Sequence, residues 1–494
     1  MTTRLLAAVD LGSNSFRLEI GRVEGNRVVP IDTWKETLRF GAGVDAQGYL
    51  SAESCAQAIA TLARFGERLR GFGPDQVRAV GTNALRVARN AAEFLPLAER
   101  ALGFPIEIVA GREEARLIYA GVSHTLPNSK DPRLVVDIGG GSTEFILGRQ
   151  FEPELMESVP VGCVGHSLRH FPDGRFTAKA FLRAELAARS VIEGVVDEFS
   201  RRRWQEAFGS SGTARALAEL LEKNAWSEEG ITRSGLADLR QFMIRHGDVR
   251  SLLSSGLQAL KTERAPVLAG GLAIMAALMD ELKIERILPA GGAMRLGVLY
   301  DLLGRFEHSD LRETTVNRIN ERYGVDAAQA RRVSELATFF LAPFEPRASE
   351  HTRQLLRWAA SWHEIGRAIA HDDYHKHGSY VLEHADLPGF STGEQRVIGQ
   401  LVLGQRGNLK KVRGLIDEPR WRGPLSALRL AVIFAHARRD IDSPPVTLRA
   451  GRGLRLALPE AWLEEHPLTA YLLEGEAASW RAEGVDFRVE SATS

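Results

Sequence analysis

The chain has only two cysteines, Cys55 and Cys163, and this scarcity excludes a disulfide framework and a cysteine-rich metal site. It has no excess charge of either sign, because 63 basic residues stand against 63 acidic residues. A general nucleic-acid binder needs a basic excess and is not expected, although a local basic groove is compatible with this balance. The chain has no charged leader and no apolar run of the roughly 18 residues that a membrane span needs. We therefore expect a cytoplasmic protein without a membrane span.

Two long segments repeat one order of strands and helices. Residues 1–124 begin with three apolar strands separated by glycine turns, followed by strands that alternate with helices. Residues 125–305 begin in the same way, with three strands from residue 133 onward. The repeat has a period of about 125 residues, far longer than a solenoid unit. This pattern predicts two similar α/β lobes that face each other, each a mixed sheet with helices on both faces.

Strands give way to helices from about residue 310. Apolar residues recur at helical spacing over residues 316–344, 350–370 and 426–439, which predicts an all-α domain over residues 310–440. The pattern changes again after Pro444, where two strands, a helical stretch and a last strand predict a small α+β piece over residues 441–494. A length of 494 residues suits three or four such domains.

Each lobe places an aspartate at the end of a strand, directly before a glycine turn. The stretch AAVDLGSNSFRLEI contains Asp10, and the stretch VVDIGGGSTEF contains Asp137 and Glu144. Glycine has no Cβ, so the N–H groups of such a turn can converge on a phosphate, although one turn alone also suits an ordinary hairpin. Carboxylates beside phosphate repel it unless a hard cation such as Mg²⁺ lies between them. The paired copies therefore predict a cleft that holds phosphate from both sides, with these three carboxylates as candidate metal ligands.

Six spaced segments occur in order along the chain: DLGSNSFRL, GTNALR, GREEARLIYAG, DIGGGSTEF, SSGTARALAEL and LPAGGAMRLGVL. Together they resemble the exopolyphosphatase/guanosine pentaphosphatase (Ppx/GppA) family. The resemblance implies an α/β fold of two actin-like (ribonuclease H-like) ATPase-type lobes, an all-α HD-like domain and a small C-terminal α+β piece. It also implies hydrolysis of a terminal phosphoanhydride, in inorganic polyphosphate or in pppGpp, with Mg²⁺ or another divalent cation. Family members are often dimers, so a homodimer is expected.

The resemblance assigns roles to residues in these segments. The family's catalytic glutamate falls on Glu114, with Glu113 as the nearby alternative, and a carboxylate there suits the activation of a water molecule. Its metal carboxylates fall on Asp137 and Glu144, with Asp10 a weaker candidate. Its groups that bind phosphate or substrate fall on Gly12, Ser13, Asn14, Ser15, Arg17, Arg86, Gly139, Gly140, Gly141, Ser142, Thr143, Ser211, Gly212 and Thr213.

The segment LLRWAASWHEIGRAI in the helical region resembles the HDIG segment of HD-type metal phosphohydrolases. Those enzymes hold a metal with a His–Asp pair and with outlying histidine and aspartate ligands. Here Glu364 follows His363, and His436 stands where an aspartate is expected. Gln329 and Arg331 lie near the place of the leading histidine. We therefore expect an HD-like domain that has lost its ligands and is not catalytic.

A long polyanion needs a basic track, and the helical region is rich in basic residues. We expect a track if the following side chains share a face, with a solvated charged surface as the alternative. They are Arg331, Arg332, Arg353, Lys376, Arg406, Lys410, Lys411 and Arg413. Four histidines between residues 371 and 384 could form a metal cluster, a loop near bound polyphosphate, which the resemblance favours, or an exposed interdomain segment.

Three functions compete on this sequence. The first is an exopolyphosphatase, with pppGpp hydrolysis as the alternative reaction, and the basic helical region favours inorganic polyphosphate as the substrate. The second is a kinase or ATPase of the same fold, which a glutamate after the glycine turn of GREEAR does not favour. The third is a non-catalytic protein that binds polyphosphate or alarmone. Retention of Glu114, Asp137 and Glu144 argues against this third function.

Overall fold

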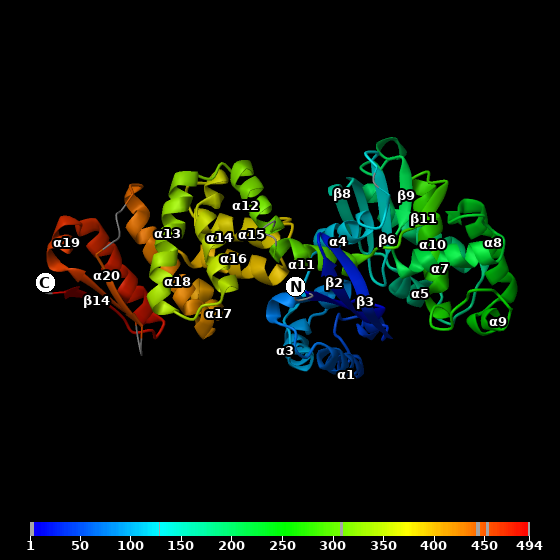
Figure 1. The fold of residues 1–494 in the computed structure, drawn as a ribbon, viewed down its shortest axis with the longest axis horizontal. Helices are drawn as coiled ribbons and strands as arrows, with labels where there is room; N and C mark the ends of the chain where they lie inside the picture. Colours follow the sequence, from blue (N-terminus) through cyan, green and yellow to red (C-terminus); the bar gives the residue numbers. More distant parts are fainter. Residues whose placement is uncertain (1–3, 128, 307–309, 441–444, 451–453, 493–494) are drawn as a thin grey trace. The chain divides into compact units, whose positions relative to one another are not determined.

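A computed structural model describes residues 4–127, 129–306, 310–440, 445–450 and 454–492. The chain divides into two compact units, residues 1–311 and 312–494 (Figure 1). Each unit has apolar clusters of its own. No helix within the described ranges is long and apolar enough to cross a membrane.

The first lobe is built on a five-stranded sheet with the order β3-β2-β1-β4-β5. Strands β1, β2 and β3 form an antiparallel meander, and β1, β4 and β5 run parallel. Its strands are β1 (Leu5–Leu11), β2 (Ser15–Glu24), β3 (Arg27–Thr37), β4 (Val77–Gly81) and β5 (Ile106–Ile108). Its helices are α1 (Ala52–Arg68), α2 (Asn83–Val87), α3 (Ala91–Leu102) and α4 (Gly111–Ser123). Of these, α3 was not expected from the sequence.

The second lobe repeats this topology. Its sheet has the order β10-β11-β9-β6-β7-β8, so β6, β7, β8, β9 and β11 correspond to β1–β5, and β10 is added at one edge. Its strands are β6 (Arg133–Ile138), β7 (Thr143–Arg149), β8 (Glu152–Val159), β9 (Glu206–Gly209), β10 (Ile231–Thr232) and β11 (Arg286–Pro289). Its helices are α5 (Cys163–His170), α6 (Ala178–Ile192), α7 (Gly212–Lys223), α8 (Arg233–His246), α9 (Val249–Leu253) and α10 (Ala265–Glu281). The shared strand order confirms the repeated mixed α/β architecture.

The last helix of each repeat packs against the sheet of the other lobe. Helix α4 contacts β7 and β8, whereas α11 (Met294–Phe306) contacts β1 and α4. One apolar cluster, which includes Leu6 of β1, Ile146 of β7 and Leu117 of α4, joins both sheets. The sequence assigned α11 to the second lobe, but its apolar face is buried against the first. This exchange carries residues of α4 to the second lobe and residues of α11 to the first.

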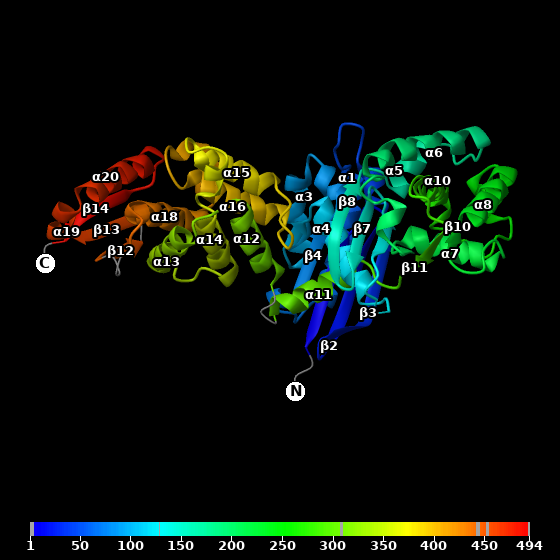
Figure 2. The ribbon, with the colours of Figure 1, turned by 90° about the horizontal axis from the view of Figure 1, so that it is seen from above.

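The second unit is a helical bundle followed by a small sheet (Figure 2). Its helices are α12 (Leu311–Arg322), α13 (Ala327–Phe344), α14 (Glu350–Ser361), α15 (Tyr374–His384), α16 (Thr392–Gly404), α17 (Arg413–Asp417) and α18 (Pro419–Phe434). The C-terminal piece contains β12 (Thr447–Ala450), β13 (Leu454–Pro459), α19 (Glu460–Glu465), α20 (Pro467–Ala482) and β14 (Phe487–Ala492). The expected start of this piece, residues 441–444, lies outside the described residues.

Candidate active site

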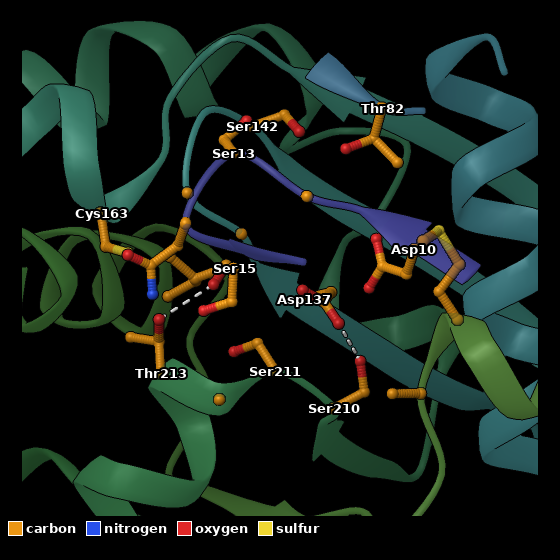
Figure 3. A pocket seen from close by; sticks show the side chains of 18 of the residues that line it. Asp10, Ser13, Ser15, Thr82, Asp137, Ser142, Cys163, Ser210, Ser211 and Thr213 are labelled. Atoms are coloured by element: carbon orange, nitrogen blue, oxygen red, sulfur yellow. Dashed lines mark hydrogen bonds between the residues drawn. The ribbon is translucent and has the colours of Figure 1, made fainter. Parts of the chain in front are cut away.

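A cleft in the first unit is lined by both glycine turns (Figure 3). The turn after β1 and the turn after β6 touch each other: a Cβ added to Gly140 would lie 2.9 Å from Cβ of Ser13. A Cβ on Gly141 would lie 2.2 Å from Oδ1 of Asn83, far inside van der Waals contact. Larger residues would therefore push the turns apart, which explains why glycines occur together between Asp137 and Glu144.

Most of the predicted phosphate-binding residues line this cleft. They are Gly12, Ser13, Asn14, Ser15, Arg17, Gly139, Gly140, Gly141, Ser142, Ser211, Gly212 and Thr213. Thr143 and Arg86 are absent from the lining. The hydroxyl of Thr143 donates to the carbonyl of Val161 at 2.5 Å, so it braces the turn. Arg86 instead acts on the cleft through Glu114.

The register of the two sheets places charged side chains in matching rows. In the first lobe, Asp10 lies opposite Arg17, and Arg17 lies opposite Lys35 on the next strand. In the second lobe, Asp137 lies opposite Glu144 in the same way. Directly paired residues on neighbouring strands project from the same face of a sheet. Arg17 and Glu144 therefore occupy the same position of the repeat, which is basic in the first lobe and acidic in the second.

Glu114 lies on the first turn of α4 and is 8% exposed. Nη1 of Arg86 donates to its Oε2 at 3.2 Å and to the carbonyl of Val109 at 2.8 Å. Burial raises the pKa of Glu114 to about 7; Arg86 opposes this rise, and the carboxylates of Asp10 and Asp137 add to it. A carboxylate with a pKa near neutrality is well suited to accept a proton from water.

Glu113 has a different environment, although it is adjacent in sequence. Arg116 donates to both of its carboxylate oxygens, from Nε and Nη2, at 2.8 Å each. Nη2 of Arg116 also donates to Asp301 of α11 at 2.5 Å. Glu113 does not line the cleft. Its carboxylate is therefore used in packing α4 against α11, which favours Glu114 for catalysis.

The three candidate metal carboxylates are close enough to Glu114 or to one another to affect their pKa values. Burial raises the pKa of Asp10 to about 6, against the influence of Arg295 and Arg17. Burial also raises the pKa of Asp137, whose Oδ2 accepts a hydrogen bond from Ser210. The pKa of Glu144 is raised well above its ordinary value by burial and by the charges of Glu114 and Asp137. This cluster is electrostatically unfavourable unless protons or a cation offset its charge.

The donor set fits a hydrated divalent cation. Oδ1 of Asp10 is buried and accepts no hydrogen bond from the described residues, so it retains a free lone pair. Within the described ranges, no three acidic, histidine or cysteine side chains meet closely enough to bind one ion together. Mg²⁺ usually keeps several waters and needs only one or two protein carboxylates. Asp10 and Asp137 line the cleft, whereas Glu144 is buried, is not part of the lining, and accepts a hydrogen bond from Ser158 at 2.8 Å.

Four arginines line the cleft together with the carboxylates: Arg17, Arg215, Arg264 and Arg295. Burial and the nearby charge of Arg295 lower the pKa of Arg17 to about 10. Burial and Arg295 also lower the pKa of Arg215. Guanidinium groups that repel one another form a strong site for a polyanion. Sequence reasoning identified only Arg17, although Arg215 and Arg295 each belong to one of the quoted motifs.

The HD-like segment of the second unit contains ion pairs. Glu364 accepts hydrogen bonds or ion pairs from Arg438 and from Arg367, the latter at 2.9 Å. His363 is buried, and its Nδ1 lies 2.7 Å from the carbonyl of Ala360. Two cationic side chains therefore contact the acid that would correspond to a metal ligand.

The expected basic track of the second unit is present only in part. Burial and the charges of Arg429, Lys376 and Arg406 lower the pKa of Lys411 to about 8, which indicates that these cations lie close together. His375 lies beside Lys411 and Arg406, and its pKa falls to about 4 because of burial and their charges. Four other expected members contact partners within this unit: Arg331 and Arg332 pair with Asp440, Arg413 pairs with Asp417 and Glu483, and Arg353 donates to the carbonyls of Ala348 and Pro346. Acids far away in sequence neutralise Arg332 and Arg413, whereas neighbouring carbonyls hold Arg353.

Comparisons with known proteins agree with the fold. A family model described as the Ppx/GppA phosphatase family matches residues 20–306, and one for Ppx/GppA phosphatase domain III matches residues 311–477. A crystal structure of an exopolyphosphatase from Cytophaga hutchinsonii has a TM-score of 0.54 at 22% identity, covering 61% of this chain and 98% of that one. A Ppx/GppA family member from Aquifex aeolicus has a TM-score of 0.51 at 24% identity, covering 62% of this chain and 100% of that one. At these identities, the two structures show a common fold.

Proposed function

Because the chain belongs to the Ppx/GppA phosphatase family, we propose that it is an exopolyphosphatase that removes the terminal phosphate of inorganic polyphosphate. The observation that carries this proposal is the composition of one cleft. Four arginines and two glycine turns line it together with three carboxylates, Asp10, Glu114 and Asp137. Such a set suits a substrate with many negative charges and a terminal phosphoanhydride that water attacks.

In the proposed reaction, Glu114 accepts a proton from a water molecule while the oxygen of that water attacks the terminal phosphorus. A bond forms between that oxygen and phosphorus, and the bridging P–O bond breaks. The electron pair of this bond goes to the oxygen of the shortened chain, and orthophosphate is the other product. Arg86 keeps a fraction of Glu114 ionised near neutral pH, because it opposes the rise in the pKa of that carboxyl.

Arg17, Arg215, Arg264 and Arg295 hold phosphate oxygens in this proposal, and the N–H groups of the two turns support them. Asp10 and Asp137, supported by the nearby Glu144, would hold Mg²⁺ or another divalent cation. When bound, such a cation neutralises charge on the phosphate and polarises it toward attack. Ser210 and Ser158 orient the carboxylates of Asp137 and Glu144.

Arg406 and Lys411 lie close to Lys376, which pairs with Asp373 at 2.7 Å, and this cationic patch of the second unit favours a long polyanion over pppGpp, because a chain of many phosphates benefits from further cations. The test is release of orthophosphate from purified full-length protein with Mg²⁺. Polyphosphate of several lengths, pppGpp and ATP are offered at equal phosphate-end concentration. Faster hydrolysis of polyphosphate is expected. A higher kcat/KM for pppGpp would reassign the substrate, and binding without release from any of them would leave only a binding protein.

A further inference from the structure

A second cavity, of about 900 Å³, lies in the first unit and borders the proposed active site. It is lined by the β2–β3 hairpin, the end of α4, the β7–β8 turn and the segment that precedes and begins α11. The cleft and this cavity share two residues of that segment, Ala293 and Arg295. These two residues therefore form part of the wall between the cavities.

Arg295 contacts an acid on each side of this wall. Its Nε donates to Oε2 of Glu19 at 2.9 Å, and Glu19 lines the second cavity. Its Nη1 lies 3.8 Å from Oδ2 of Asp10, which lines the cleft. Arg295 is 9% exposed and Glu19 is 7% exposed, so the pair is largely shielded from bulk water. A phosphate oxygen that competes with Glu19 for this guanidinium would loosen the wall, because both partners are anions bound to one cation.

The second cavity has groups that suit a small anion. Arg133 lines it, is 3% exposed, and has an Nε without a hydrogen-bond partner among the described residues. This Nε lies 3.6 Å from a carboxylate oxygen of Glu206. Arg27 is exposed in the same lining, and the side chains of Ser123 and Thr125 add hydroxyl groups. The positive charges of Arg133 and Arg27 favour an anion in this cavity.

The cleft itself gives a reason for a separate exit. In the proposed reaction, the terminal phosphate lies beside Glu114 and Asp10, and Arg17 of the cleft is followed in register by Lys35, which lies outside the lining. On this proposal, Arg17 keeps hold of the remaining chain after each cut. Orthophosphate formed at the inner end is confined between the chain and the wall that contains Arg295.

We infer that the second cavity is the exit through which orthophosphate leaves while the shortened chain stays in the cleft, with the Arg295–Glu19 pair at its inner end. This inference rests on the proposed function. It assigns the cavity a ligand, hydrated orthophosphate, and assigns Arg133 and Arg27 to its passage. The route lets the enzyme cut again without releasing its polymer.

Gly291 offers a way to narrow the exit without touching the cleft. It lines the second cavity, and a Cβ there would lie 3.7 Å from Cβ of Thr125, at ordinary contact distance. Gly291→Leu should therefore fill part of the passage, and Gly291→Ala is the matched control. Full-length variants are mixed with long polyphosphate and Mg²⁺. Quenched flow then measures all orthophosphate cleaved, and a fluorescent phosphate-binding protein measures orthophosphate that has left the enzyme.

In Gly291→Leu, first-turnover cleavage should stay within about twofold of wild type, whereas free orthophosphate should appear about fivefold or more later, as expected when product release limits turnover. Gly291→Ala should behave as wild type. Simultaneous cleavage and release in a folded Gly291→Leu would overturn the exit. Slowed first-turnover cleavage in that variant would also overturn it, because the cavity would then serve the chemical step.

A second pair of variants keeps the inference testable if Gly291→Leu does not fold. Arg27→Glu reverses an exposed charge in the cavity lining and should also delay release, whereas Arg22→Glu, on β2 but outside the lining, should not. Equal rates of orthophosphate release in Arg27→Glu and Arg22→Glu would overturn the assignment of this cavity as the exit. Wild-type protein that cleaves none of the offered phosphoanhydrides contradicts the proposed function instead.

Discussion

At the scale of single residues, the structure separates two adjacent glutamates. Glu114 lines the cleft and accepts a hydrogen bond from Arg86, whereas Glu113 is held by Arg116. Glu114→Gln should lower kcat on polyphosphate by about 10²-fold or more, as loss of a general base does, with KM little changed. Glu113→Gln should instead lower the melting temperature, and its kcat should stay far above that of Glu114→Gln. Near-wild-type turnover in Glu114→Gln would contradict the assignment.

Arg86 should set the pH dependence of the reaction. Glu114 acts as a base only when ionised, so kcat should rise with pH through the pKa of this group, which is raised to about 7. Arg86→Ala removes a cation that lowers this pKa, so the acid limb of the pH–kcat profile should move upward by about one pH unit. The exposed Arg112 of α4, which pairs with Glu157 of β8, provides the control Arg112→Ala. An acid limb that does not move would show that another group governs the profile.

At the scale of elements, a buried ionic network fixes α4 against α11. Asp301 of α11 accepts hydrogen bonds from Arg78 at 2.7 Å and from Arg116 at 2.5 Å. Burial alone would raise the pKa of Asp301, but Arg116, Arg78 and Arg305 hold it well below its usual range. Asp301→Asn removes a buried charge shared by Arg78 and Arg116, which keep only Glu107 and Glu113 as acidic partners among the described residues, and should cost about 3 kcal/mol in the free energy of unfolding.

Because α4 carries Glu114, Asp301→Asn should also lower kcat more than it changes KM. Chemical denaturation and steady-state kinetics measure the two effects. Asp280→Asn, in an ion pair with Arg189 whose side chains are each more than a third exposed, is the control and should change neither by much. Unchanged unfolding of Asp301→Asn would show that the network contributes little to the packing of α4.

At the scale of the whole molecule, four carboxylates link the stability of the folded state to pH and to cations. They are Asp10, Glu114, Asp137 and Glu144. Their pKa values are raised in the folded state, to about 6 for Asp10 and about 7 for Glu114. The folded state therefore binds more protons than the unfolded state between roughly pH 4 and 7, and this contribution to stability is lost as pH rises through that range. Mg²⁺ should replace the protons and raise the melting temperature, more at pH 8 than at pH 5.5.

Thermal unfolding of the full chain with and without Mg²⁺ measures this effect. Asp137→Asn, which keeps the size of the side chain, should reduce the stabilisation by Mg²⁺. Stabilisation that is equal at both pH values, and equal in this variant, would place the cation elsewhere.

A second whole-molecule prediction concerns the two units. The apolar clusters of residues 1–311 contain no residue from the second unit, so a chain that ends at Leu311 should fold. It retains the proposed catalytic groups and lacks the cationic patch around Lys411. We expect it to cleave short oligomers at nearly the full-length kcat. Long chains should bind less tightly and with a weaker salt dependence, because fewer cations contact phosphates. A folded truncated protein with the full salt dependence would contradict a role for that patch.

The sequence by itself determined the repeated strand order and the aspartate at the end of β1 and β6, because apolar alternation and glycine turns are local signals. It also located the two turns that line the cleft, since the residue types in them are set by close backbone approach. It did not find Arg264, which belongs to no motif, and it left Glu113 and Glu114 as alternatives. Two neighbours on a helix point in different directions, and local sequence does not decide which of them faces a cleft.

Only the tertiary structure decided which charges act together. Arg17, Arg215 and Arg295 are far apart in sequence, and their convergence depends on the packing of β2, α7 and α11. The exchange of α4 and α11 between the lobes brings Glu114 close enough to Glu144 to raise the pKa of that carboxyl. In the second unit, long-range partners neutralise Arg332 and Arg413, which the sequence alone suggested for a track. The physical reason is that hydrophobic periodicity is a local property of the sequence. The partner of a charged side chain depends instead on which distant segments pack together in the fold.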